Sequence, residues 1–294
     1  MSEEREEAER ENKRIDMRQH ADKLIQGFEK LNESDAKRAI WELLQNAVDV
    51  SEKCKVIITI TDNSLIFQHN GTPFTSTTLN SLIKQVSSKT SQSNDSEVGQ
   101  YGTGFITTHS FGKRILLSGS LKIKDGYVHF ENFEIDRIAK DNDELINKLL
   151  EQEKNSLDLI DKKDNNVKQN PSEFTTFEYL VATDLEKENV EKVIDELNLA
   201  LPYVMSLNDK LIKVTVIDKN KKETIFQKNR EYFENTIKIT PILINSIEQR
   251  IYSISDTEDK LTVILPLENP NKAISFDPKL GGLTRVYHVH FFLR

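Results

Sequence analysis

The sequence contains a single cysteine, Cys54, among its 294 residues. One thiol excludes an intramolecular disulfide framework and leaves too few thiolates for a structural zinc cluster. No apolar run approaches the length of a membrane span, and the charged N-terminal stretch MSEEREEAERENKR lacks the apolar segment of a signal peptide. These absences predict a protein of the reducing cytoplasm, with no membrane partner.

Positive charge is also scarce, since 40 Lys and Arg residues stand against 48 Asp and Glu residues, for a formal net charge of −8. A broad basic face for nucleic acid does not fit this balance, although a local basic patch would. Nucleic acid is therefore not the partner that the composition indicates. The length permits one large core or two modest ones, and two are expected.

Helical and β patterns alternate along the chain, which is typical of an α/β protein. Helices are predicted at about residues 3–31, 34–51, 75–86, 103–112, 144–153 and 186–205. Strands are predicted at about residues 55–62, 64–70, 113–123, 126–135 and 174–182. The first helix carries an apolar stripe at helical spacing, formed by Met17, Ala21, Leu24, Ile25 and Phe28.

After about residue 206 the pattern changes to a series of short β runs, which predicts a second, β-rich domain. The chain ends on the apolar stretch VYHVHFFLR, and we expect the sequence to be a fragment of a longer protein. Much earlier in the chain, between the helices predicted at 75–86 and 103–112, residues 87–97 read SSKTSQSNDSE. They contain no apolar side chain, which predicts a mobile loop.

The stretch WELLQNAVD, within the second predicted helix, places Glu42, Asn46 and Asp49 at i, i+4 and i+7. All three side chains therefore project from one helix face, while Ile40, Leu43, Leu44, Ala47 and Val48 supply an apolar surface for packing on a sheet. Two carboxylates and an amide in one row can hold Mg²⁺ through oxygen ligands and polarise a water molecule. On spacing alone, a solvated polar stripe is the simpler interpretation.

The stretch VGQYGTGF places Gly99, Gly102 and Gly104 within six positions, directly before a predicted helix. Exposed backbone amides at a helix N-terminus form an anion site that needs no lysine. A glycine-rich hinge is the alternative for this stretch in isolation. Together, the acid and amide helix face and the glycine stretch describe a nucleotide site with a polar loop between its two parts.

The pattern E-x-x-x-N-A-x-D at residues 42–49, followed about fifty residues later by VGQYGTGF, resembles the GHKL or Bergerat-fold ATPases. This superfamily includes gyrase, the ninety-kilodalton heat-shock chaperones, histidine kinases and MutL. The glycine stretch is most similar to the G-x-[FY]-G-x-G-F version of the heat-shock chaperones and the sacsin and MORC proteins. The resemblance spans roughly residues 34–182, with the motifs in the order of the family.

The resemblance implies that Glu42 is the general base that orients the attacking water and that Asn46 ligates Mg²⁺ between the phosphates. Asp49 would support the nucleotide through hydrogen bonds or water. The triphosphate of ATP would lie on the backbone amides of Gly99, Gln100, Tyr101, Gly102, Thr103, Gly104 and Phe105. Residues 87–98 would form a lid over bound ATP, with Lys89 as a phosphate contact.

The adenine-binding motif departs from the pattern of the family, which is D-x-G-x-G with an Asp that accepts a hydrogen bond from the adenine amino group. Here the stretch is HNGTPF, so His69 takes the Asp position, Gly71 is kept and Pro73 replaces the second glycine. A neutral imidazole can still accept a hydrogen bond, and Asn70 is a further candidate contact. Thr175, in FTTFEYL, falls where the family has a Ser or Thr that helps to bind adenine.

The fold implied is a Bergerat sandwich of class α/β (α+β), with helices on one face of a mixed, mostly antiparallel sheet. Residues 1–33 would form an N-terminal helical segment and residues 34–205 the ATP-binding domain, with its lid at 87–98. Residues 206–294 would form part of a β-rich, transducer-like domain. Such a domain often contributes a basic residue to the γ-phosphate, and Lys210, Lys213 and Arg285 are candidates by position only.

The leading function is Mg²⁺-dependent ATP binding with slow hydrolysis, which would close the lid and bring two N-terminal domains together in a larger chaperone-like or remodelling protein. The first helix would then be a dimer contact, or its stripe would simply pack on its own domain. The client and the C-terminal domains are not indicated by the sequence.

Two other functions remain open: a scaffold that senses nucleotide without turnover, and a histidine-kinase-like phosphotransferase. The second has little support, because His20, in DMRQHADKLI, does not resemble a phosphoacceptor box. His288 and His290 alternate onto one strand face, where isolated surface histidines are a simpler interpretation than a metal site. Trp41 is expected to serve packing.

Overall fold

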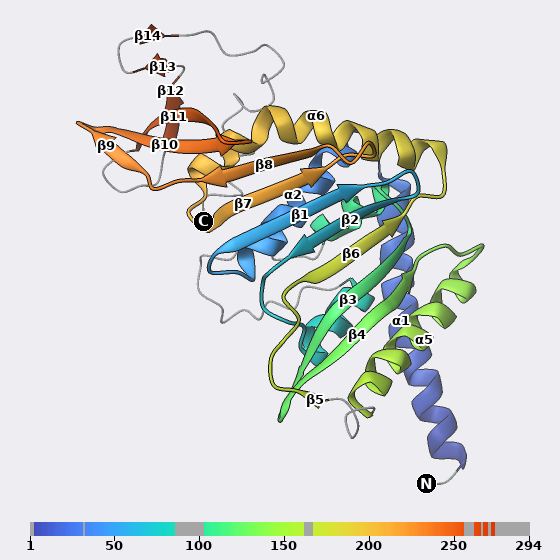
Figure 1. Cartoon of the computed structure of the whole chain (residues 1–294). Coiled ribbons are helices and arrows are strands. Elements are labelled where there is room, and N and C mark those ends of the chain that lie inside the picture. Colours follow the sequence, from blue (N-terminus) through green and yellow to red (C-terminus); the bar gives the residue numbers. More distant parts are fainter. Residues whose placement is uncertain are drawn as a thin grey trace.

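One large mixed sheet organises the chain in the computed structural model, which describes residues 3–31, 33–85, 103–161, 167–255, 262–265, 267–269 and 272–273. Within these residues the sheet has 12 strands in the order β12-β11-β10-β8-β7-β1-β2-β6-β3-β4-β5, with β9 paired to β10. The helices lie behind one face of this sheet in Figure 1. The expected fold, helices on one face of a mixed and mostly antiparallel sheet, is confirmed.

The element bounds follow the predicted pattern closely. The helices are α1 (Glu3–Glu29), α2 (Glu33–Asp49), α3 (Ser76–Lys84), α4 (Thr103–Thr107), the 3-10 turn η1 (Thr108–Ser110), α5 (Asn142–Asp161) and α6 (Asp184–Leu207). The first strands are β1 (Cys54–Ile60), β2 (Ser64–His69), β3 (Arg114–Ile123), β4 (Gly126–Asp136), β5 (Val167–Lys168) and β6 (Thr175–Leu180). The later strands are β7 (Leu211–Ile217), β8 (Glu223–Lys228), β9 (Tyr232–Glu234), β10 (Ile237–Ile244), β11 (Ile247–Ser255), β12 (Thr262–Leu265), β13 (Leu267–Asn269) and β14 (Lys272–Ala273).

Local capping explains where the helices begin. Thr75 precedes α3, and its hydroxyl accepts the N–H of Thr78 at 3.1 Å, while the Thr78 hydroxyl accepts the N–H of Thr75 at 2.8 Å. Thr183 and Glu186 form the same reciprocal capping box at the start of α6. Each box satisfies backbone donors that a helix N-terminus otherwise leaves unpaired.

Two predicted helices differ in extent from the observed ones. Residues 103–112, predicted as one helix, form only the short α4 and the turn η1. The chain must turn there because Gly112 lies against β6, where an added Cβ would come 2.5 Å from the carbonyl oxygen of Leu180. In contrast, α5 runs over 20 residues, well beyond the predicted 144–153, because Leu159 and Ile160, near its end, also pack against the core.

The packing of α2 on the sheet positions the acidic and amide residues of the predicted site. Its predicted apolar surface is buried, with Ile40 and Leu44 at 0% exposure and Leu43, Ala47 and Val48 at 6% or less. The facing strand β1 alternates in burial, so Cys54, Val56, Ile58 and Ile60 point to the helices. Burial of this apolar surface orients α2, and its opposite face carries the polar row.

The strands after residue 206 continue the same sheet. β7 pairs in parallel with β1, in the register Val56↔Val214 and Ile58↔Val216, and it is the one parallel pairing between named strands of the described residues. β8, β10 and β11 follow by antiparallel pairing. The β-rich segment is thus hydrogen-bonded to the preceding unit, and its role as a transducer-like domain stays a prediction.

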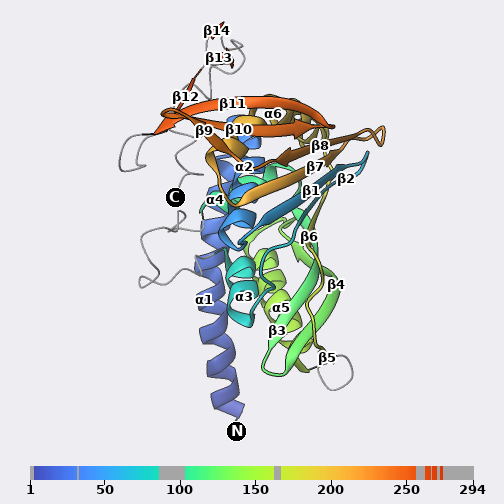
Figure 2. The same ribbon diagram turned by 60° about the vertical axis from the view of Figure 1, so that its left-hand side comes forward.

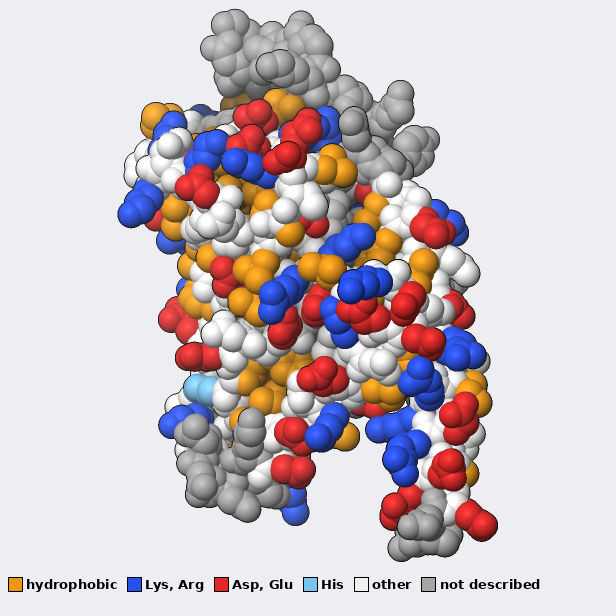
Figure 3. All heavy atoms as spheres, turned by 90° about the vertical axis from the view of Figure 1, so that its right-hand side faces the viewer, with side chains coloured by type: hydrophobic (Ala, Val, Ile, Leu, Met, Phe, Trp, Pro, Cys, Tyr) orange, Lys and Arg blue, Asp and Glu red, His pale blue; other side chains and the backbone are white. Residues whose placement is uncertain are grey.

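The apolar stripe of α1 packs on its own domain, as the simpler of its two interpretations expects. Met17, Ala21 and Leu24 are fully buried, and Ile25 and Phe28 are half-buried against the same core. Figure 2 shows the helix alongside α3 and α5. Its N-terminal end projects beyond the domain (lower right in Figure 3) and carries mostly acidic and basic side chains.

Leu24→Ala should lower the free energy of unfolding by about 2–5 kcal/mol, because it removes buried methyl groups and leaves a cavity. The matched control is Leu157→Ala on α5, where the leucine is 48% exposed and a change within about 0.5 kcal/mol is expected. Urea titration followed by circular dichroism measures both values. Equal midpoints for the two variants would show that α1 does not pack on its own domain in solution.

Candidate functional site

The polar row of α2 lies where the sequence predicts it, on the face away from the buried leucines. Glu42 and Asp49 are half-buried, and Asn46 is exposed. The Nε atom of Arg38, one turn earlier on α2, donates to Oε1 of Glu42 at 2.9 Å. The Glu42 side chain is 18% exposed, so this ion pair holds a carboxylate at the edge of the core.

Arg38 is a residue that sequence reasoning missed. The signal was present, since Arg38 and Glu42 stand at i and i+4 on the predicted helix, the spacing at which a basic and an acidic side chain meet. The pair occupies Oε1 and leaves Oε2 to face the neighbouring helix α4. Arg38 therefore limits the positions that the Glu42 carboxylate can take.

Helix α4, which follows the glycine stretch, touches Glu42 directly. A Cβ atom added to Gly104 would lie 2.2 Å from Oε2 of Glu42 and 2.7 Å from its carboxyl carbon. Only glycine allows this approach without moving the carboxylate. The structure thus brings together two predicted site residues that are 62 positions apart in the chain.

Part of the predicted phosphate site is outside the described residues. This applies to Lys89, Gly99, Gln100, Tyr101, Gly102, the lid at 87–98 and, at the C-terminal end, Arg285, His288 and His290. Of the glycine stretch, the structure describes Thr103, Gly104 and Phe105, at the first turn of α4. The roles predicted for all these residues stay predictions.

The HNG motif lies at the end of β2, against the C-terminal end of α2. His69 is 7% exposed, and its Nδ1 accepts the N–H of Gly71 at 3.1 Å. A Cβ atom added to Gly71 would lie 2.5 Å from Val50 and 2.9 Å from the Ser51 hydroxyl, so a larger residue does not fit there. The HNG motif is therefore in contact with Val50, the residue that follows Asp49 at the end of α2.

Thr175 is the direct cross-strand neighbour of His69, in the register of β2 and β6. Both side chains lie on the sheet face that the helices cover, and Thr175 is 4% exposed. The two residues that the resemblance associates with adenine are therefore adjacent in space, although 106 positions separate them in the chain.

An aromatic cluster joins the HNG motif to α4, and sequence reasoning missed its centre, Phe177. The His69 ring stacks on Phe177 with centroids 6.0 Å apart and planes at 26°. The ring centroid of Phe105, in the glycine stretch, lies 6.1 Å from that of Phe177. The strand alternation in FTTFEYL, which places Phe177 on the same face as Thr175, was the available signal.

Burial controls the charge of the histidines near this site. Desolvation lowers the pKa of His69 to about 4, and it lowers the pKa of His109, behind α4, to about 3. Both rings are therefore neutral at physiological pH. His69 therefore presents a neutral imidazole at the position where the resemblance to the GHKL ATPases predicts an aspartate.

Asn70 and Lys213 are placed differently from the other candidates. The Asn70 amide accepts the N–H of Lys55 at 2.7 Å and donates to the carbonyl of Lys53 at 3.0 Å, so its polar groups hold the start of β1. Lys213 pairs with Lys55 on the sheet face opposite Val56 and α2. This placement does not favour a contact of Lys213 with a phosphate near Glu42.

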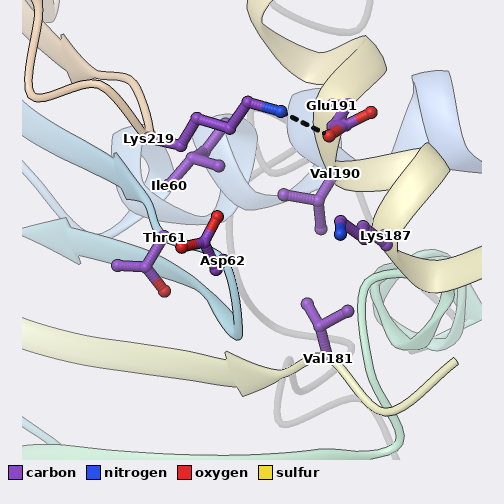
Figure 4. Close-up of a pocket in the computed structure, with 8 residues that line it drawn as sticks. All are labelled: Ile60, Thr61, Asp62, Val181, Lys187, Val190, Glu191 and Lys219. Atoms are coloured by element: carbon purple, nitrogen blue, oxygen red, sulfur yellow. Dashed lines mark hydrogen bonds and ion pairs between the residues drawn. The ribbon is translucent and has the colours of Figure 1, made fainter. Parts of the chain in front are cut away.

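A shallow hollow lies at the opposite end of β2 from His69, beside the β1–β2 turn (Figure 4). Lys219 crosses it to pair with Glu191 at 2.7 Å, with Asp62 and Val181 nearby. None of the predicted site residues lines this hollow.

Comparison with protein families supports the fold. Residues 34–166 match the family described as histidine kinase-, DNA gyrase B- and HSP90-like ATPase. The matched region includes Glu42, Asn46, Asp49, the HNG motif and the glycine stretch, while Thr175 lies beyond it. No curated protein matches the chain.

This match supports ATP binding, and it confirms the resemblance to the GHKL ATPases. The closer similarity to the heat-shock-chaperone, sacsin and MORC type stays a prediction. None of the helices in the described part of the chain has the length and apolar character that a membrane span requires. Within the same residues, no three acidic, histidine or cysteine side chains gather into a metal site.

Gly104→Ala should reduce ATP turnover about tenfold or more, because the added methyl group displaces the carboxylate of Glu42, the predicted general base, and misplacement of such a group by about 1 Å is costly. The free energy of unfolding should change by less than about 1 kcal/mol, since the carboxylate can move away by giving up its ion pair with the exposed Arg38, which contributes little. A coupled phosphate-release assay and urea titration measure the two effects.

As a control, Glu42→Ala should remove the clash, so that adding Gly104→Ala to it leaves the midpoint of unfolding unchanged. Turnover at the wild-type rate in the single Gly104→Ala variant would mean that the contact between α4 and Glu42 has no role in the reaction.

Proposed function

We propose that this chain binds ATP with Mg²⁺ beside α2 and α4 and hydrolyses it slowly. The observation that carries the proposal is the contact of Oε2 of Glu42 with Gly104, at the first turn of the helix that follows the glycine stretch. A carboxylate at that point is adjacent to the helix N-terminus, where backbone amides favour phosphate groups. A general base must lie within reach of the water that attacks such a phosphate.

The polar residues of α2 would have separate roles in the reaction. Glu42 orients the attacking water through Oε2, while Arg38 holds Oε1. Asp49, half-buried at the end of the helix, supports the nucleotide between the phosphates and the HNG motif. Phosphoryl transfer depends mainly on positioning and charge stabilisation, so these groups are sufficient.

The donor set fits a magnesium ion that is held chiefly by the substrate. Mg²⁺ binds through oxygen, usually through one or two protein groups in addition to substrate phosphates, and it neutralises the charge of those phosphates. The Asn46 amide is exposed on the polar row of α2, one turn from Glu42, and forms no hydrogen bond to any described residue. Asn46 would therefore hold the ion.

At the other end of the nucleotide, His69, Gly71 and Thr175 would contact the base. His69 and Thr175 are cross-strand neighbours, and Gly71 allows the backbone to approach the end of α2 closely. Asn70 would act mainly by fixing the start of β1, where its amide accepts one hydrogen bond and donates another.

We further propose that ATP closes the segment 87–98 over the site and favours a homodimer, as a step in the work of a larger cytoplasmic chaperone-like or remodelling protein. The charged, projecting end of α1 is the part of that helix still free to contact a second copy, because its apolar stripe is buried. Light scattering with a non-hydrolysable ATP analogue tests the dimer, and a monomer would contradict it.

A nucleotide sensor without turnover is the second candidate function. The ion pair of Glu42 with Arg38 favours it, because the guanidinium occupies Oε1 and leaves only one carboxylate oxygen to face a water molecule. A phosphotransferase has less support, since His20 is half-buried near Asp16 and Lys84, where burial lowers its pKa.

Glu42→Ala should lower ATP turnover by about 100-fold or more and leave ATP affinity within about threefold, because the carboxylate acts on water rather than on the nucleotide. Asn46→Ala should weaken binding of ATP in the presence of Mg²⁺ by about tenfold or more, since it removes the side chain that would hold the magnesium ion. Isothermal calorimetry with ATP, ADP and GTP, together with a turnover assay, measures these changes.

The control is Asn220→Ala, in the exposed turn between β7 and β8, which should leave both affinity and turnover unchanged. Tight ATP binding without any turnover in the wild type would favour the sensor. Absence of binding by any of the three nucleotides would contradict the proposed function.

A further inference from the structure

The protonation of the His69 ring can be deduced from its contacts. A backbone N–H is always a hydrogen-bond donor, and the N–H of Gly71 points at Nδ1 of His69 at 3.1 Å. Nδ1 must therefore be the unprotonated nitrogen. Because burial lowers the pKa of His69 to about 4, the ring is neutral and carries its one proton on Nε2.

The Nε2–H group has no hydrogen-bond partner among the described residues, although His69 is only 7% exposed. Nε2 of His69 does not belong to the fully enclosed polar atoms that lack a partner among the described residues, so its N–H stays accessible to a bound molecule. An accessible imidazole N–H on a buried ring is free to donate to a ligand. The partner of Nε2 must be a hydrogen-bond acceptor, whatever molecule supplies it.

The surroundings of the ring restrict where that acceptor comes from. The ring face stacks on Phe177, with Phe67 on the neighbouring part of the strand at 6.3 Å between centroids. Thr175, the cross-strand neighbour, adds a hydroxyl that can donate or accept. An aromatic wall with one fixed donor and one adaptable hydroxyl suits the edge of a flat heterocycle.

We propose that His69 recognises the base of the bound nucleotide by donating its Nε2–H to ring nitrogen N1 of adenine, so that the 6-amino group is not required. This inference rests on the proposed function, because it assigns the base to the same site. A carboxylate at this position could only accept a hydrogen bond, and would select the amino group instead. His69 is therefore the hydrogen-bond donor to the base, whereas an aspartate at this position is the acceptor.

Three triphosphates distinguish donation of a hydrogen bond to N1 from acceptance of one from the 6-amino group. All three can be tested on the wild-type protein. Purine riboside triphosphate lacks the 6-amino group and keeps N1, whereas 1-deaza-ATP keeps the amino group and lacks N1. We expect purine riboside triphosphate to bind within about threefold of ATP, and 1-deaza-ATP to bind about tenfold or more weakly, as for loss of one buried hydrogen bond. Calorimetry with Mg²⁺ measures all three.

His69→Asp should reverse this order, because its carboxylate accepts from the amino group and cannot donate to N1. The matched control is His129→Asp, at an exposed histidine of β4, which should keep the wild-type order. The analogue series on the wild type does not depend on either variant folding.

Each other outcome overturns the inference. Strong binding of ATP with much weaker binding of purine riboside triphosphate would show that the amino group is read, while the proposed function would stand. Equal binding of all three triphosphates would show that His69 reads neither group. Failure of every triphosphate to bind would overturn the proposed function, and this inference with it.

Discussion

The close approach of α4 to Glu42 is the contact on which the rest of the site depends. Gly104 brings the first turn of α4 against the carboxylate, and Arg38 holds the other carboxylate oxygen from one turn earlier on α2. The helix that follows the glycine stretch and the candidate base are thus fixed relative to each other. A side chain at position 104 would separate them, so the arrangement needs both the glycine and the packing of α2 on the sheet.

Contacts of α1 with α3 and α4 support this arrangement. Gly27 of α1 lies so close to α4 that an added Cβ would come 2.9 Å from Ile106, and Asp16 of α1 pairs with Lys84 at the end of α3 at 3.2 Å. The guanidinium of Arg137, which is 2% exposed, donates to the carbonyl of Ile83 at 2.6 Å in the same region. α1 therefore packs against both α3 and α4, which explains why its apolar stripe is buried within its own domain.

Much of this architecture could be predicted because its signals are local. The i, i+4, i+7 spacing of Glu42, Asn46 and Asp49 requires only that the segment be helical, and the apolar residues between them decide which face is buried. The short extent of α4 could not be predicted, because it depends on the contact of Gly112 with Leu180 in another strand. The continuation of the sheet through β7 had no local signal either, since pairing with β1 joins segments about 160 positions apart.

The sequence by itself determined the chemistry available at the site: a carboxylate, an amide and a second carboxylate on one helix face, a glycine stretch, and a histidine in the HNG motif. Residue identity and helical or strand periodicity are properties of the chain, so they hold before any tertiary contact forms. Only the tertiary structure decided which of these groups meet and in what protonation state. The pairing of His69 with Thr175, the ion pair on Glu42 and the neutral ring of His69 all arise from burial and from contacts between distant segments, and neither burial nor such contacts is written in local spacing.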